Sequence, residues 1–329
     1  MILTVNNLSV SFPVSSGIFQ KDLFGISAVH HVSFSIRKGE IFGLAGESGC
    51  GKSSLGRALA HLFQVAGMKA QLTGQVELLC GQERVLLSLL TQKQMRPYRR
   101  HIQMIFQDPF HSLNPRMTIG EIIHEPLQIH FPHSGRKERQ ERVDSLMEKV
   151  GLSPEYGRRF PHELSGGQRQ RICIARVLAV SPQIIIADEP LSSLDVSIQA
   201  QIVNLLRDLQ EDLNLTYIFI SHDLSVMKYL ANRIAVMYLG TFVEIGETDE
   251  VYQNPRHPYT QALFSSIPDL KDEKIKKNTL KGEIPSPQYR PTGCCFRTRC
   301  PIARSECSIA VPQLMRFSDN HDVACPYVL

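Results

Sequence analysis

The chain has 329 residues, of which 43% are hydrophobic and 21% charged, enough for a sizeable core and too apolar for global disorder. Its net charge of +4 is too small an excess to indicate nucleic acid as a partner. No apolar run approaches the ~20 residues of a membrane-spanning helix, and the N-terminus has no secretory signal. We therefore expect a soluble cytoplasmic protein with one large domain, or a domain with an appendage.

Strands and helices alternate along most of the chain. Apolar and polar positions alternate over residues 3–12 and 29–36, as in half-buried strands. A short apolar strand over 41–45 leads into a glycine-rich loop, and a helix follows over 53–62. Further strands are predicted over 102–106, 183–187 and 216–221, and further helices within 115–160 and over 168–179, 198–214 and 224–231. This order predicts an α/β fold with a mostly parallel sheet.

The glycine-rich loop has the composition of a phosphate-binding loop. It reads Gly46-Glu47-Ser48-Gly49-Cys50-Gly51-Lys52-Ser53, with Ser54 next along the helix. Glycines let backbone amides point at phosphate oxygens, and the helix presents its positive end to them. In such a loop Lys52 reaches the β- and γ-phosphates, and the Ser53 hydroxyl binds Mg²⁺. Alone, the loop indicates only that some nucleoside triphosphate is bound.

Two acids, Asp188 and Glu189, follow the apolar strand over 183–187. The carboxyl end of a buried strand is where ligands bind in α/β folds. Asp188 is placed to hold Mg²⁺ through water, and Glu189 to orient and deprotonate an attacking water. An ordinary turn after a strand is the alternative, and the preceding phosphate loop makes it the minor one.

A second anion site is predicted where the stretch Leu164-Ser165-Gly166-Gly167-Gln168 opens a helix. The phosphate loop, this pentapeptide and the Asp-Glu pair, in this order, resemble the ATP-binding cassette (ABC) ATPases over about the first four-fifths of the chain. The resemblance implies a P-loop ABC ATPase with a helical subdomain at about 108–180. It also implies that two cassettes bind head to tail with ATP between them, so that the pentapeptide serves a nucleotide held mainly by the other subunit.

The resemblance implies roles for four further residues. Gln107 matches the glutamine that touches Mg²⁺ and links the site to the helical subdomain, and His222 matches the histidine that contacts the γ-phosphate. Asp195 matches the loop that lines the subunit interface. For the aromatic residue that stacks on adenine we prefer Phe24. The insertion over 13–27 leaves Phe19 and Phe12 as alternatives, and a packing role is equally compatible.

Two stretches narrow the resemblance to the ATPases of oligopeptide and dipeptide importers. They are Phe106–Met117 and His257–Leu263, and the Pro-rich tail from Gly282 to Pro301 matches the C-terminal extension of the same family. The resemblance implies an ATPase coupled to peptide uptake, at the cytoplasmic face of the membrane. Its partners are a second, different ATPase subunit, two transmembrane permease subunits and an extracytoplasmic peptide-binding protein. The alternatives are an importer of another small solute, such as nickel chelates, and a soluble ABC ATPase.

Composition changes near residue 268, which predicts a nucleotide-binding domain over 1–268 and a Cys-rich extension over 269–329. Five of the eight cysteines lie in the last 36 residues. In the importer family four cysteines of this extension hold a [4Fe–4S] cluster, and the matching residues are Cys294, Cys300, Cys307 and Cys325. Cys295 is an alternative to Cys294. Thiolates alone also allow zinc, and unliganded thiols remain a third reading.

Overall fold

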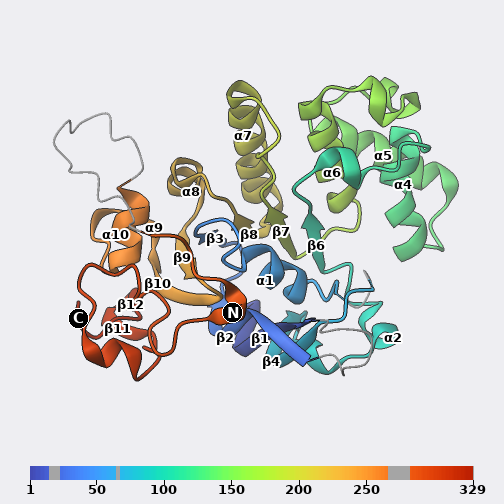
Figure 1. Cartoon of the computed structure of the whole chain (residues 1–329). Coiled ribbons are helices and arrows are strands. Elements are labelled where there is room, and N and C mark those ends of the chain that lie inside the picture. Colours follow the sequence, from blue (N-terminus) through green and yellow to red (C-terminus); the bar gives the residue numbers. More distant parts are fainter. Residues whose placement is uncertain (15–22, 64–66, 266–281, 329) are drawn as a thin grey trace. The chain divides into compact units, whose positions relative to one another are not determined.

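A computed structural model describes residues 1–14, 23–63, 67–265 and 282–328. The chain divides into two compact units. The first contains residues 1–90 and 220–329, and the second contains residues 91–219. Each unit is described by itself, with the elements labelled as in Figure 1.

The first unit contains a four-stranded antiparallel sheet with the strand order β2-β1-β4-β5. Its strands are β1 (Leu3–Val14), β2 (Leu23–Ile36), β4 (Gln71–Cys80) and β5 (Glu83–Leu86). Alternate side chains of β1 are buried, as its sequence pattern predicts. The buried set shifts from Leu3 and Val5 to Leu8 and Val10, because an irregularity in the pairing falls between Val5 and Leu8.

The same unit contains part of a larger sheet, with the strand order β11-β12-β10-β9-β3. Strands β3 and β9 are parallel, and the pairs from β9 to β11 are antiparallel. The strands are β3 (Ile41–Ala45), β9 (Arg233–Tyr238), β10 (Thr241–Glu247), β11 (Met315–Ser318) and β12 (His321–Val323). The helices are α1 (Lys52–Leu59), α8 (Leu224–Leu230), α9 (Thr248–Gln253) and α10 (Pro258–Phe264), with short 3₁₀ turns η1 (Leu87–Leu89), η4 (Pro287–Tyr289) and η5 (Ser305–Ser308).

The C-terminal segment, red in Figure 1, is attached to the first unit through β12, which pairs with β10. A buried contact between two side chains supports this pairing. His321 Nε2 lies 2.6 Å from Glu244 Oε1, and both side chains are fully buried. The Glu244 carboxylate also accepts the backbone N–H groups of Arg256 and His257 at 2.8 and 2.9 Å. A buried carboxylate with three partners is satisfied, and it ties β10, β12 and the start of α10 together.

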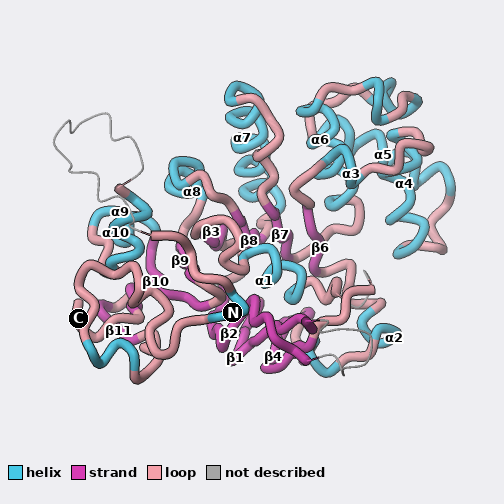
Figure 2. Tube along the Cα trace, in the orientation of Figure 1, coloured by secondary structure: helices cyan, strands magenta, loops and turns pink. Residues whose placement is uncertain are grey.

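The second unit contains three strands in the order β8-β7-β6 and a group of helices. The strands are β6 (Ile102–Ile105), β7 (Ile184–Asp188) and β8 (Thr216–Ile220), whose last residue falls in the first unit. Figures 1 and 2 show α4, α5 and α6 side by side, and these helices contact one another. The helices are α2 (Gln92–Met95), α3 (Pro109–Ser112), α4 (Ile119–His130), α5 (Arg136–Lys149), α6 (Gly166–Leu178) and α7 (Val196–Leu213), with 3₁₀ turns η2 (Pro154–Arg158) and η3 (Pro161–Glu163).

The predicted α/β fold is confirmed, with parallel pairing at β3–β9 and β6–β7. The elements predicted around the motifs lie within a few residues of their expected bounds. The sequence interpretation missed the strands β4, β5, β9, β10, β11 and β12, and it did not resolve the helices α2, α3, α9 and α10. In the described ranges no helix is long and apolar enough to span a membrane.

Candidate functional site

The glycine-rich loop connects β3 to α1 and is shaped by close backbone contacts. Gly51 is the N-terminal cap of α1 and has a φ of 109°. A Cβ atom there would lie 2.1 Å from the carbonyl oxygen of Ala28, and one at Gly46 would lie 2.2 Å from that of Met237. Any side chain at either position would therefore force the loop away from β2 or β9.

Lys52 is the first residue of α1 and its side chain turns back over the loop. It is 4% exposed, and its ammonium group donates to the carbonyl oxygens of Gly46 at 2.7 Å and Glu47 at 2.9 Å. Because these two acceptors are neutral carbonyls, the hydrogen bonds hold Lys52 at the loop without neutralising its positive charge. This arrangement suits a loop that binds an anion.

Glu47 is held by contacts that the sequence interpretation did not foresee. Its backbone N–H donates to the hydroxyl of Tyr259, from α10, at 2.9 Å. Its carboxylate accepts from the guanidinium of Arg299, in the C-terminal segment, at 2.8 and 3.2 Å. Tyr259 and Arg299 lie in stretches that resemble the importer family, but no sequence pattern predicts that either residue contacts the loop.

In the second unit, three of the predicted residues lie at strand ends. Asp188 is the last residue of β7 and is 1% exposed. Glu189 follows with a φ of 47°, a backbone conformation that side-chain-bearing residues rarely adopt and that is often found at functional sites. Gln107 follows β6, the parallel neighbour of β7, and its amide nitrogen lies 3.1 Å from Glu189 Oε2. The fold therefore brings Gln107 and Glu189 together.

The pentapeptide at residues 164–168 forms the start of α6. Ser165 caps the helix, because its hydroxyl accepts the backbone N–H of Gln168 at 3.3 Å while the Gln168 side chain accepts that of Ser165 at 3.0 Å. Gly167 has no room for a side chain, since a Cβ atom there would lie 2.6 Å from Ile198 in α7. Ser165 and Gly166 are exposed, so the positive end of α6 faces solvent. Asp195 is exposed at the start of α7.

The remaining predicted residues lie in the first unit. His222 is exposed just after β8, and the next residue, Asp223, caps α8. Phe24 is in β2, opposite Pro13, but its side chain lies outside the described residues, as does the whole of Phe19. Phe12 packs edge-on against Phe63, with ring centroids 5.3 Å apart. The choice of the adenine-stacking residue therefore stays a prediction.

The prediction of an iron–sulfur cluster is wrong, and the zinc alternative fails with it. The described residues include all five cysteines of the extension, and among them no group of three or more Cys, His, Asp or Glu side chains is arranged to hold a metal ion. Burial raises the pKa of Cys294 to about 12 and also raises the pKa values of Cys300 and Cys325. These raised pKa values keep the three thiols protonated at neutral pH in the metal-free chain. The matching spacing of cysteines was therefore not sufficient to establish a metal site.

The side chain of Cys295, the alternative to Cys294 as a metal ligand, lies against Tyr238 and Thr241. Its sulfur lies 3.5 Å from the Thr241 hydroxyl and 3.8 Å from the Tyr238 carbonyl oxygen. It therefore packs on the β9–β10 hairpin.

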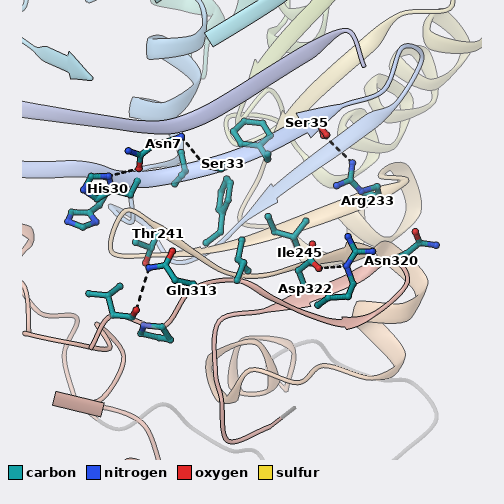
Figure 3. A pocket seen from close by; sticks show the side chains of 18 of the residues that line it. Asn7, His30, Ser33, Ser35, Arg233, Thr241, Ile245, Gln313, Asn320 and Asp322 are labelled. Carbon is teal, nitrogen blue, oxygen red and sulfur yellow. Dashed lines mark hydrogen bonds and ion pairs between the residues drawn. The ribbon is translucent and has the colours of Figure 1, made fainter. Parts of the chain in front are cut away.

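A pocket of about 780 Å³ lies in the first unit, between β2, β10 and the C-terminal segment (Figure 3). Its wall includes His30, Ser33, Thr241 and Gln313, as well as Arg233, which donates to the Ser35 carbonyl oxygen at 3.2 Å. None of the predicted nucleotide-binding residues lines this pocket.

Comparison with known proteins agrees with the geometry of the loop and the strand ends. The family model described as ABC transporter matches residues 29–192, and the model of the oligopeptide/dipeptide transporter C-terminal region matches residues 243–307. Among solved structures, the dimeric post-hydrolysis state of the ATP-binding cassette MJ0796, bound to ADP and Pi, is 27% identical with a TM-score of 0.63. The match covers 75% of this chain and 98% of that one. Fold and loop thus define the class of protein as an ATP-binding cassette.

Two curated relatives narrow the class. The oligopeptide transport ATP-binding protein AppF of Bacillus subtilis (strain 168) is 49% identical, and the match covers 98% of this chain and 96% of AppF. The oligopeptide transport ATP-binding protein OppF of Escherichia coli (strain K12) is also 49% identical, over 99% of this chain and 96% of OppF. The chain belongs to the oligopeptide/dipeptide family of ABC transporter ATP-binding proteins.

Proposed function

We propose that the chain is the ATP-hydrolysing subunit of an ABC importer for oligopeptides or dipeptides. The observation that carries the ATPase part is the 3.1 Å contact between Gln107 and Glu189, at the ends of two parallel strands in a chain that also contains a complete phosphate loop. The peptide part is supported by the C-terminal region matched over 243–307 and by relatives named for oligopeptide transport. No finding favours the nickel-chelate importer or the soluble ATPase.

The loop residues 46–54 bind the triphosphate in this proposal. Backbone amides of the loop and the positive end of α1 bind phosphate oxygens, and Lys52 leaves its carbonyl partners for the β- and γ-phosphates. Glu189 accepts the proton of the attacking water, which Gln107 helps to orient, and His222 contacts the γ-phosphate. Asp195 lines the subunit interface.

The side chains assigned to Mg²⁺ fit that ion by their chemistry. Ser53 offers a hydroxyl oxygen, Gln107 an amide oxygen and Asp188 a carboxylate oxygen at a buried strand end. Mg²⁺ prefers oxygen ligands and binds through one or two carboxylates together with water and substrate phosphates. When bound, the ion neutralises charge that develops on the phosphates.

The exposed start of α6 suggests that hydrolysis needs a second cassette. We assign Ser165, Gly166, Gly167 and Gln168 to the nucleotide held by a partner ATPase, because capped helix ends with free amides bind anions. The remaining partners in the proposal are two permease subunits and an extracytoplasmic peptide-binding protein, with this chain peripheral at the cytoplasmic face of the membrane. The proposed division into a cassette over 1–268 and an extension over 269–329 has its boundary outside the described residues.

A transport assay tests this function. The chain is produced together with two permease subunits, a partner ATPase and a peptide-binding protein, and the complex is reconstituted into liposomes. The proposal expects uptake of a labelled oligopeptide that requires MgATP and is not supported by MgADP. Uptake of nickel chelates in place of peptides would overturn the assigned substrate and leave the ATPase standing.

A further inference from the structure

The C-terminal segment contacts the phosphate loop directly through one ion pair. The Arg299 guanidinium meets the Glu47 carboxylate with two hydrogen bonds, Nη1 to Oε2 at 2.8 Å and Nη2 to Oε1 at 3.2 Å. The Arg299 side chain is 5% exposed and that of Glu47 is 23% exposed. A bidentate, mostly buried pair of this kind fixes both position and orientation, unlike an exposed ion pair.

An aromatic cluster holds the same segment against the loop. Phe296 is 1% exposed, and its ring lies 5.2 Å from that of Tyr238 and 5.4 Å from that of Tyr259. Tyr259 accepts the Glu47 backbone N–H, and the Arg299 backbone N–H donates to the Phe296 carbonyl oxygen at 3.0 Å. Arg299 therefore contacts Glu47 directly, and Phe296 contacts it indirectly through Tyr259.

The position of Glu47 matters for Lys52, the cation that binds phosphates. The Glu47 carbonyl oxygen accepts a hydrogen bond from the Lys52 ammonium at 2.9 Å, so displacing Glu47 displaces a partner of Lys52. The Glu47 carboxylate also places a negative charge in the loop that we assign to triphosphate binding. Without a cation beside it, that charge would repel the nucleotide.

We propose that Arg299 is a positioning residue for nucleotide binding: it neutralises the Glu47 carboxylate and fixes the loop that holds Lys52. The C-terminal extension therefore contributes, through Arg299, to the binding of ATP by the loop. This inference rests on the proposed binding of ATP by the loop. It assigns the extension a role in affinity for nucleotide rather than in the chemical step.

Four full-length variants test the role of the pair, with ATP affinity measured by equilibrium titration in the presence of Mg²⁺. Arg299→Gln leaves the carboxylate unpaired, and we expect affinity to fall roughly 5- to 30-fold, as for the loss of one partner of a desolvated charge pair. The double variant Glu47→Gln/Arg299→Gln removes both charges, and we expect it to bind ATP more tightly than Arg299→Gln does, because no unpaired carboxylate is left in the loop. Arg299→Lys keeps the charge without the bidentate geometry, and its ATP affinity should lie between those of Arg299→Gln and wild type. Arg297→Gln is the matched control, because the Arg297 guanidinium donates to Thr292.

In the assembled transporter, Arg299→Gln should raise the KM for ATP and leave kcat near the wild-type value. Wild-type ATP affinity in Arg299→Gln would overturn the inference. An equal loss of ATP affinity in the single and the double variant would also overturn it, because it would mean that Arg299→Gln only damages the extension, which removing the Glu47 charge cannot repair. Thermal unfolding of each variant shows whether it is folded. Lys52→Ala separates the two claims: if it binds ATP like wild type, the assignment of the loop itself is wrong, whereas if only Arg299→Gln binds normally, the failure is confined to Arg299.

Discussion

The Gln107 amide nitrogen lies 3.1 Å from the Glu189 carboxylate, although 82 positions separate the two residues in the sequence. They meet because β6 and β7 are parallel neighbours, so residues that follow the two strands lie at the same edge of the sheet. The pair places an amide beside the acid proposed as the general base.

Glu189→Gln should lower the steady-state ATPase rate at least ~100-fold, because an amide cannot take the proton of the attacking water. ATP binding should survive, since the phosphate loop is unchanged. The measurement is phosphate release by the assembled transporter beside nucleotide titration. Glu148→Gln is the control, an exposed acid in α5. Near-wild-type turnover would remove Glu189 from the role of base.

Lys52→Ala should instead weaken ATP binding itself by about tenfold or more, because it removes the buried cation assigned to the β- and γ-phosphates. Equilibrium titration measures the effect, and Lys38→Ala, at an exposed lysine of the same unit, should bind as wild type does. An unchanged affinity in Lys52→Ala would show that the nucleotide binds elsewhere.

The motif residues could be predicted from sequence because each motif is local. The loop, the acids after β7 and the cap of α6 each depend on a short stretch whose residue types determine the turn. Glu47 and Arg299 are 252 positions apart, and nothing local to either residue specifies the other. The cysteine spacing failed for a related reason, since it says which residues resemble ligands but not whether the folded extension brings their side chains together around a metal ion.

Ser165→Arg should block closure of this chain's α6 over the nucleotide held by the partner subunit. We expect hydrolysis at that composite site to slow at least ~100-fold, as when a preorganised donor is lost, while the loop around Lys52 still binds ATP. Trapping of nucleotide by vanadate, site by site, measures this. Ser145→Arg, on the exposed side of α5, introduces the same charge as a control. Normal vanadate trapping at the composite site in Ser165→Arg would contradict the head-to-tail arrangement.

His257 predicts a dependence of stability on pH. Burial lowers its pKa to about 4, and the neutral ring accepts the Tyr259 backbone N–H at 3.1 Å through Nδ1. Between about pH 6.5 and 4 the unfolded chain binds the proton more readily than the fold does, so stability is present above pH 6.5 and is lost as the pH falls. The loss approaches about 3 kcal/mol in the free energy of unfolding at the acid end.

Urea unfolding at a series of pH values measures this dependence in the wild type and in His257→Asn. Asparagine keeps an acceptor for the Tyr259 N–H but does not titrate, so its profile should be flatter in this window. Identical slopes in the two proteins would mean that other groups control the acid response.

If this chain couples ATP hydrolysis to peptide uptake, transport by reconstituted proteoliposomes must depend on Glu189. The complex is assembled once with the wild-type chain and once with Glu189→Gln, and uptake of a labelled oligopeptide is followed with MgATP on the side of the ATPase subunits. We expect accumulation against a gradient for the wild type and none for Glu189→Gln, with both complexes binding ATP. Equal accumulation by the two complexes, or none by a wild-type complex that hydrolyses ATP, would contradict it.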